Sequence, residues 1–161
     1  PCAGAAPPPA AAAALAATPP PAAAAAAGGK PFVGAFDAII SSELAAVLAA
    51  AKDVGGDCDK STAILSKAFE RMTAVIAAVS ACKKPAQEDL GALAGPVGEC
   101  IMEADGLTGG RRGAMFNHQK AIAEFLQALT WVVYTGKDCG MSLPLPHVDE
   151  VWGAAEFYVN K

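Results

Sequence analysis

Five stretches of the sequence place large apolar side chains at three- and four-residue steps, and this spacing restricts the chain to helical folds. The stretches cover about residues 31–54, 59–83, 86–107, 116–134 and 148–161. Apolar residues at such steps fall on one face of an α-helix, whereas a half-buried strand alternates with a period of two. No alternating pattern of useful length occurs. We therefore predict an all-α antiparallel helical bundle with short links.

Glycine and proline residues predict where these helices end. The glycines at 55–56 supply left-handed backbone that ends the first helix, and Asp57 or Asp59 is placed to cap the second. A lysine pair followed by proline ends the second helix. We expect Pro96 to kink or divide the third helix. We expect the prolines in "GKDCGMSLPLPH" to keep that stretch an irregular loop, with a fifth helix from Val148 that still runs at Lys161.

Residues 1–29 differ in composition from the remainder. They consist mainly of Ala and Pro, carry no charge, and contain one large aliphatic residue, Leu15. Such a segment buries too little apolar surface to offset the entropy of ordering it, so we predict a disordered Ala/Pro linker ahead of a folded domain at 30–161. A signal or transit peptide would need basic residues that are missing, and the lack of an initiator methionine suggests a fragment or processed product. No stretch approaches about 20 consecutive strongly apolar residues, so we expect no membrane insertion.

Charge and cysteine content exclude several classes of function. The formal net charge of −4 argues against general affinity for nucleic acid. The five cysteines are scattered without a C-x-x-C pair, so we expect reduced thiols and neither a metal site nor a cofactor. The only histidines, His118 and His147, lack a nucleophile motif nearby, and Glu99 and Glu103 fit a solvated helix face. We therefore predict no catalytic residues.

One segment, "TGGRRGAMFNHQKA", is the candidate functional site. It gathers Arg111, Arg112, Asn117 and His118 within a turn-like connection. Two interpretations stay open for the arginines: a solvated loop, or a specific contact with an acidic patch on another protein. Asn117 also has a local explanation, since an amide can cap the following helix. Trp131 and Trp152 lie in apolar stripes, where packing is the default expectation.

Three segments resemble the helical folded domain of adenylyl cyclase-associated proteins. "KPFVGAFDAIISSELAAVLAAAKDVGGDCDK" is similar to an "AFD" helix that ends in "IGGDV". "RRGAMFNHQKAIAEFLQALTWVVY" resembles the family's "FNH" segment and a helix ending in "ALGWV", and "EVWGAAEFYVNK" resembles its "AAxFYTNR" helix. The resemblance covers residues 31–161. It implies a six-helix antiparallel bundle, of which the final helix would lie outside this sequence.

The resemblance implies a non-enzymatic role in the cytoplasmic actin cytoskeleton. In this family the helical domain binds the pointed-end region of cofilin-decorated actin and promotes depolymerisation, while a separate β-domain recharges actin monomers. In fungi an N-terminal coiled coil binds adenylyl cyclase. Cyclase binding and homo-oligomerisation would need segments outside this sequence.

The same resemblance implies a protein-binding site on one face of the bundle, at loops and helix ends. The matching positions are Asp57, Asn117 and His118, and Arg111 and Arg112 lie just before the "FNH" motif. Charge complementarity to acidic actin or cofilin surface would aid orientation and association rate. The alternative is a structural or scaffold bundle that binds a partner unrelated to actin.

Overall fold

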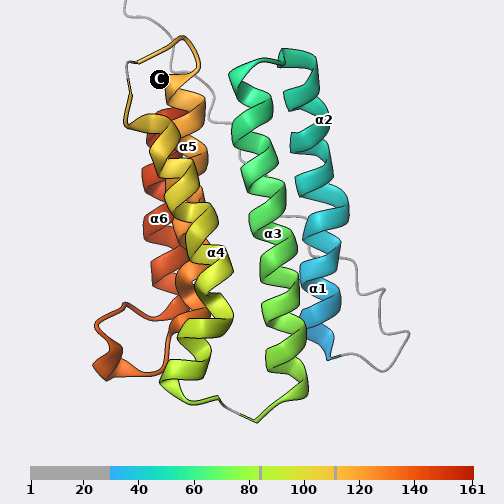
Figure 1. Ribbon diagram of the computed structural model, residues 1–161, viewed down its shortest axis with the longest axis vertical. Coiled ribbons are helices and arrows are strands. Elements are labelled where there is room, and N and C mark those ends of the chain that lie inside the picture. The colour runs from blue at the N-terminus through green and yellow to red at the C-terminus, as the bar shows by residue number, and fades with distance from the viewer. Residues whose placement is uncertain (1–29, 84, 111) are drawn as a thin grey trace, which may run out of the picture.

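The computed structural model, which describes residues 30–83, 85–110 and 112–161, consists of helices and their links (Figure 1). The first helix comprises α1 (Pro31–Ile39), a π-helical segment η1 (Ile40–Leu44) and α2 (Ala45–Val54). It is followed by α3 (Asp57–Ala81) and α4 (Gln87–Thr108). Next come α5 (Phe116–Leu126), which continues as the 3₁₀ segment η2 (Gln127–Val133), then the short η3 (Lys137–Cys139) and α6 (Pro144–Val159). The predicted all-α class is confirmed, and the predicted linker at 1–29 lies outside the described residues.

Successive helices run in opposite directions (Figure 1). The helix α3 contacts α1, α2, α4 and α5, and α5 also contacts α4 and α6. The α2–α3 turn, the α4–α5 connection and the C-terminus share one end of the bundle, which we call the upper end as drawn in Figure 1. The start of α1, the α3–α4 link and the end of η2 share the opposite, lower end.

The core is built from the inward faces of these helices. Its centre is the fully buried Met72 of α3 and Leu126 of α5. Four aromatic rings, Phe36, Phe69, Phe125 and Trp152, form a continuous series from α1 through α3 and α5 to α6, with centroid separations of 5.6, 6.3 and 6.1 Å. Other large members of the core are Leu44, Ile64, Leu65, Val75, Ile76, Val97, Ile101 and Leu129.

Several predicted helix ends differ from the structure. The helix α6 begins at Pro144, four residues before the predicted start, because prolines are tolerated in a first turn whose N–H groups lack helical partners. It ends at Val159 and not at the chain terminus. Pro96 lies inside α4 without dividing it. The last part of the predicted 116–134 helix is the 3₁₀ segment η2.

The predicted side-chain caps are absent as well. Gly56 is the N-cap of α3, and no side-chain hydrogen bond caps that helix. Asp57 and Asp59 lie instead in its first turn, where their charges interact favourably with the helix dipole. The glycine turn itself is as predicted, since Gly55 and Gly56 both have positive φ, 70° and 65°.

Some apolar side chains that the helical spacing placed in the core are exposed. Trp131 is 37% and Trp152 53% exposed, so neither is fully buried. The expected packing holds for Trp152, whose ring lies against Phe125 with the centroids 6.1 Å apart. Phe32 at 49% and Met102 at 70% also face solvent. The periodicity identifies the apolar face of a helix, but it does not show whether a neighbouring helix covers the whole of that face.

The first helix, Pro31–Val54, is long and apolar enough to cross a membrane, with a mean hydropathy of 1.7 over its most apolar window. Asp37, Glu43 and Lys52 interrupt the helix, so it is not a run of about 20 strongly apolar residues, and the absence of membrane insertion stays a prediction. Only 6% of that window is buried. A single helix of this kind does not establish insertion, because core helices of soluble proteins and signal sequences meet the same criterion. Alanine contributes part of the hydropathy here, because it occupies five of the ten residues of α2.

Candidate functional site

The candidate site lies at the upper end of the bundle (Figure 1), where α5 begins. Thr108 ends α4, and the glycine-rich connection leads to Phe116, the first residue of α5. The guanidinium carbon of Arg112 lies 4.8 Å from the centre of the Phe116 ring. A cation over an aromatic face is attracted to the ring while its N–H donors stay available. Arg112 is exposed, so it can present these donors to a partner.

Asn117 and His118 occupy the first turn of α5. Asn117 is half-buried and His118 is exposed, and the side chain of neither makes a hydrogen bond or ion pair within the described part of the chain. The capping role suggested for Asn117 was wrong, because α5 begins at Phe116 with Met115 as N-cap, two residues before Asn117, and has no side-chain cap. With no capping role, the Asn117 amide can contribute to binding a partner.

Asp57 lies at the same end of the bundle, on α3 (Figure 1). Its carboxylate pairs with Lys60 of the same helix, with 2.9 Å between Oδ1 and Nζ. Both side chains are more than half exposed, so this pair contributes little to stability. The structure therefore brings Arg112, Asn117 and His118 together in one segment and places Asp57 on a neighbouring helix at that end. Arg111 lies outside the described residues.

An ion-pair network that sequence reasoning missed supports the start of α5. Lys120 Nζ lies 2.9 Å from Glu124 Oε1 and 3.2 Å from Asp105 Oδ1, so it joins α5 to the end of α4. The hydrogen bond with Glu124 raises the pKa of Lys120. The four-residue spacing of Lys120 and Glu124 could have indicated the first contact, but nothing local in sequence indicates the second.

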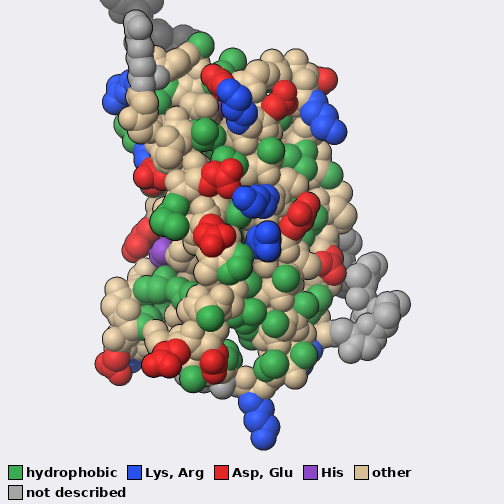
Figure 2. All heavy atoms as spheres, in the orientation of Figure 1, with side chains coloured by type: hydrophobic (Ala, Val, Ile, Leu, Met, Phe, Trp, Pro, Cys, Tyr) green, Lys and Arg blue, Asp and Glu red, His purple; other side chains and the backbone are tan. Residues whose placement is uncertain are grey.

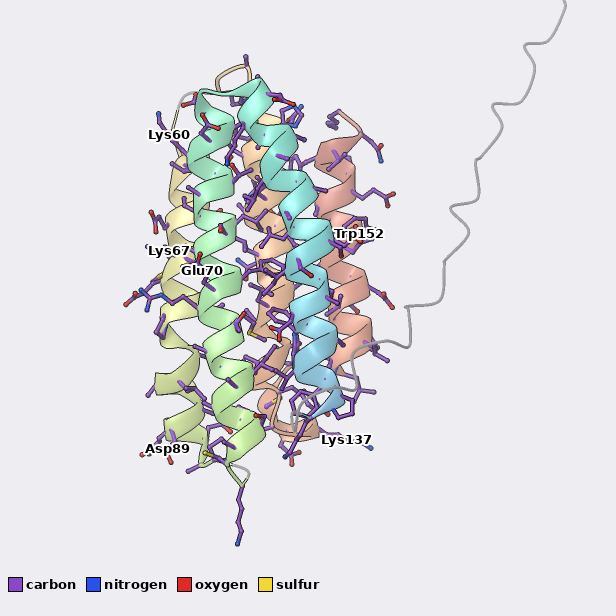
Figure 3. The ribbon with its side chains drawn as sticks, turned by 90° about the vertical axis from the view of Figure 1, so that its right-hand side faces the viewer. Lys60, Lys67, Glu70, Asp89, Lys137 and Trp152 are labelled. Atoms are coloured by element: carbon purple, nitrogen blue, oxygen red, sulfur yellow. The ribbon has the colours of Figure 1, made fainter. Side chains whose placement is uncertain are left out.

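The face made by α3 and α4 carries mixed charge. Figure 2 shows acidic and basic side chains interspersed over it, and Lys60 and Lys67 project outward from α3 in Figure 3. Lys67 Nζ lies 2.9 Å from Glu103 Oε2 on α4, and the hydrogen bond with Glu103 raises the pKa of Lys67. Glu103 is thus one half of an exposed ion pair, which agrees with the prediction of a solvated face for Glu99 and Glu103.

The second histidine, His147, makes hydrogen bonds that connect two helical segments of the fold. Its Nε2 atom lies 2.8 Å from Thr130 Oγ1 and 3.2 Å from the Gln127 carbonyl oxygen. The carbonyl can only accept, so the geometry fits an Nε2–H donor that ties α6 to η2. Among the described residues, no three His, Cys, Asp or Glu side chains are grouped to hold a metal ion.

The chain is an all-α domain, an antiparallel helical bundle. The exposed polar groups at the start of α5, after the glycine-rich connection, are suited to contacts with another protein. Residues 36–161 match the family described as "CAP, N-terminal domain". The chain therefore belongs to the cyclase-associated protein (CAP) family, through that family's N-terminal domain.

Individual relatives agree with this assignment. The chain is 40% identical over 134 residues to cyclase-associated protein 1 of Arabidopsis thaliana and 35% identical over 132 residues to adenylyl cyclase-associated protein 1 of Homo sapiens. Each alignment covers 81% of this chain but only 28% and 26% of the relative, so the chain spans about a quarter of the length of these relatives.

Solved structures show the same fold. The N-terminal domain of CAP whose crystal structure indicates variable oligomerisation superposes with a TM-score of 0.72 at 31% identity, over 83% of this chain and 71% of that one. The N-terminal domain of the adenylyl cyclase-associated protein from Dictyostelium discoideum gives a TM-score of 0.71 at 31% identity, over 80% and 70% of the two chains.

Proposed function

We propose that this domain regulates actin filament turnover by binding the pointed-end region of cofilin-decorated filaments and promoting depolymerisation. The observation that carries the proposal is that residues 36–161 belong to the CAP family. Members of this family act in actin turnover. On this proposal the protein works by binding and has no catalytic residues. Its location is the cytoplasmic actin cytoskeleton, and adenylyl cyclase would be contacted only through parts outside this chain.

The upper end of the bundle is the proposed contact surface. Arg112 stacks on Phe116 and remains exposed, and His118 is exposed beside it. The neighbouring Lys120 is held by Asp105 and Glu124, so the start of α5 is anchored to α4. A preorganised cation loses less side-chain entropy on binding than an unrestrained one. Complementarity to acidic surface on actin or cofilin would mainly raise the association rate.

The test is the rate of pointed-end depolymerisation of single actin filaments in the presence of cofilin, with the whole chain. We expect the chain to accelerate shortening. Replacing Arg112 with Ala should weaken the acceleration, more strongly at low salt, because exposed charges are screened at higher ionic strength. Asn117→Ala and His118→Ala should weaken it too, and Arg111→Ala tests the residue that the structure does not describe.

Arg71→Ala is the matched control. Arg71 is an exposed arginine on α3, so its removal changes net charge equally without touching the upper end. Equal loss of activity for Arg71→Ala and Arg112→Ala would indicate a nonspecific charge effect and would rule out the upper end of the bundle as the contact surface. If a helical, folded chain leaves the shortening rate unchanged, the actin proposal fails and the scaffold interpretation takes its place.

A further inference from the structure

The lower end of the bundle contains a cavity of about 250 Å³, at the opposite end from the proposed contact surface. It opens where the start of α1, the α3–α4 link and the end of η2 meet (Figure 1). We call it the aromatic cavity, because three rings contribute to its wall. Its main lining residues are Phe32, Val79, Pro85, Leu90, Trp131 and Tyr134.

The local helix geometry explains why two of these rings face the same space. Trp131 lies in the 3₁₀ segment η2, and Tyr134 follows it by three residues. Because a 3₁₀-helix has three residues per turn, side chains three apart point in the same direction. Phe32 comes from the first turn of α1 on another side of the cavity. Phe32 and Trp131 are still 49% and 37% exposed, so the cavity is accessible from solvent.

The size of the cavity limits what it can hold. An apolar cavity of about 150 Å³ accommodates a benzene-sized molecule, whereas sites for independent small-molecule ligands usually measure about 300–1,000 Å³. The aromatic cavity lies between these values. It therefore suits one or two ring-sized apolar groups that are carried on a longer chain.

The chemistry of the lining favours proline rings. Among the residues that the structure describes, no charged side chain lines the cavity. At its edge Thr135 Oγ1 donates a hydrogen bond to Gln87 Oε1, 2.9 Å away. Aromatic-lined grooves with few polar groups bind proline-rich segments in the polyproline II conformation, which loses little entropy on binding. The polar groups among the described lining residues are few, the Trp131 indole N–H and the Tyr134 and Thr135 hydroxyls, so a charged ligand would find no ion-pair partner among them.

The chain supplies such a segment close by. Pro19, Pro20 and Pro21 precede Phe32 by eleven residues or slightly more, and no charged residue other than Lys30 lies between. Eleven residues span at most about 40 Å when extended, which is enough for the chain to turn back to a cavity that Phe32 itself lines. A short linker of this kind gives an effective concentration in the millimolar range. We propose that the Pro19–Pro21 run of the same chain docks into the aromatic cavity.

The test uses Trp131 as an internal probe. The chain has two tryptophans, so Trp152→Phe leaves Trp131 as the only one, and Trp152 is exposed enough to tolerate the change. Quenching of Trp131 fluorescence by acrylamide then reports whether the cavity is covered. The test variant replaces Pro19, Pro20 and Pro21 with Ser.

Replacing Pro7, Pro8 and Pro9 with Ser provides a control matched in composition and in number of changes. Docking would cover Trp131, so the quenching constant should about double in the Pro19–Pro21 variant and stay unchanged in the Pro7–Pro9 variant. A free peptide with the sequence "ATPPPAA" at millimolar concentration should restore protection to the Pro19–Pro21 variant.

Three results would overturn the proposal. Unchanged quenching in both variants would show that the cavity does not hold the run. Equal increases in both would show that it does not distinguish Pro19–Pro21 from the other prolines. Protection that disappears on dilution would assign the cavity to the tract of a second copy of the chain.

Discussion

Replacing Leu126 with Ala would test the packing of the bundle at its centre. Leu126 is fully buried between α5 and the core residues of α3 and α4. The change removes three carbon groups, which at about 0.8 kcal/mol each amounts to about 2.4 kcal/mol of lost burial. The remaining cavity adds to this, and buried Leu→Ala changes cost about 2–5 kcal/mol in general. We expect a loss of about 3–4 kcal/mol in the free energy of unfolding on these grounds.

Leu145→Ala is the matched control, because Leu145 on α6 is 79% exposed and its truncation should cost less than about 0.5 kcal/mol. The assay is urea unfolding followed by circular dichroism. With a slope of about 2 kcal/mol per molar urea, Leu126→Ala should lower the midpoint by about 1.5–2 M. A loss below about 1 kcal/mol for Leu126→Ala, or equal losses for the two variants, would contradict the burial pattern.

Two further predictions follow from the backbone and the thiols. Gly56→Ala should destabilise the fold by about 1–3 kcal/mol because Gly56 has positive φ. Gly91→Ala, in an open position within α4, should stabilise the fold by about 0.5–1 kcal/mol. Thermal unfolding compares the two variants, and stability changes of the same sign would contradict the positive φ of Gly56 as the cause of its effect. Backbone N–H groups of Thr135 and Met141 lower the pKa of Cys139, whereas burial raises the pKa of Cys100. Alkylation followed by mass spectrometry should therefore modify Cys139 first, with a rate that reaches half its maximum below the ordinary thiol pKa, and equal rates at both would refute this.

The fold was largely predictable because its signals are local. Apolar spacing fixed the number of helices, and Gly55 and Gly56 marked a turn that needs positive φ. The errors arose where one residue can serve two structures. Pro144 was interpreted as part of a loop, yet a proline is equally suited to the first turn of a helix. Asp57 and Asn117 are common capping residues, yet α3 begins one residue and α5 two residues too early for that role.

The candidate site was only partly predictable. Its segment stood out because Arg112, Asn117 and His118 are close in sequence, and the structure places them together. The contact of Lys120 with Asp105 joins residues fifteen apart, and the aromatic cavity joins Phe32 to Trp131. Contacts of this kind depend on how helices pack, and helical periodicity alone does not fix which helices become neighbours.

The series of aromatic rings also affects the order in which the domain can assemble. Phe36 stacks on Phe69, Phe69 on Phe125, and Phe125 meets Trp152. During synthesis Phe36 and Phe69 leave the ribosome before Phe125 does. The first helix (α1–α2) and α3 can therefore pair early, while the second face of the Phe69 ring stays uncovered until Phe125 has been synthesised. Closing such distant contacts costs more loop entropy than pairing adjacent helices. The aromatic series is therefore complete only when α6, which carries Trp152, has been synthesised.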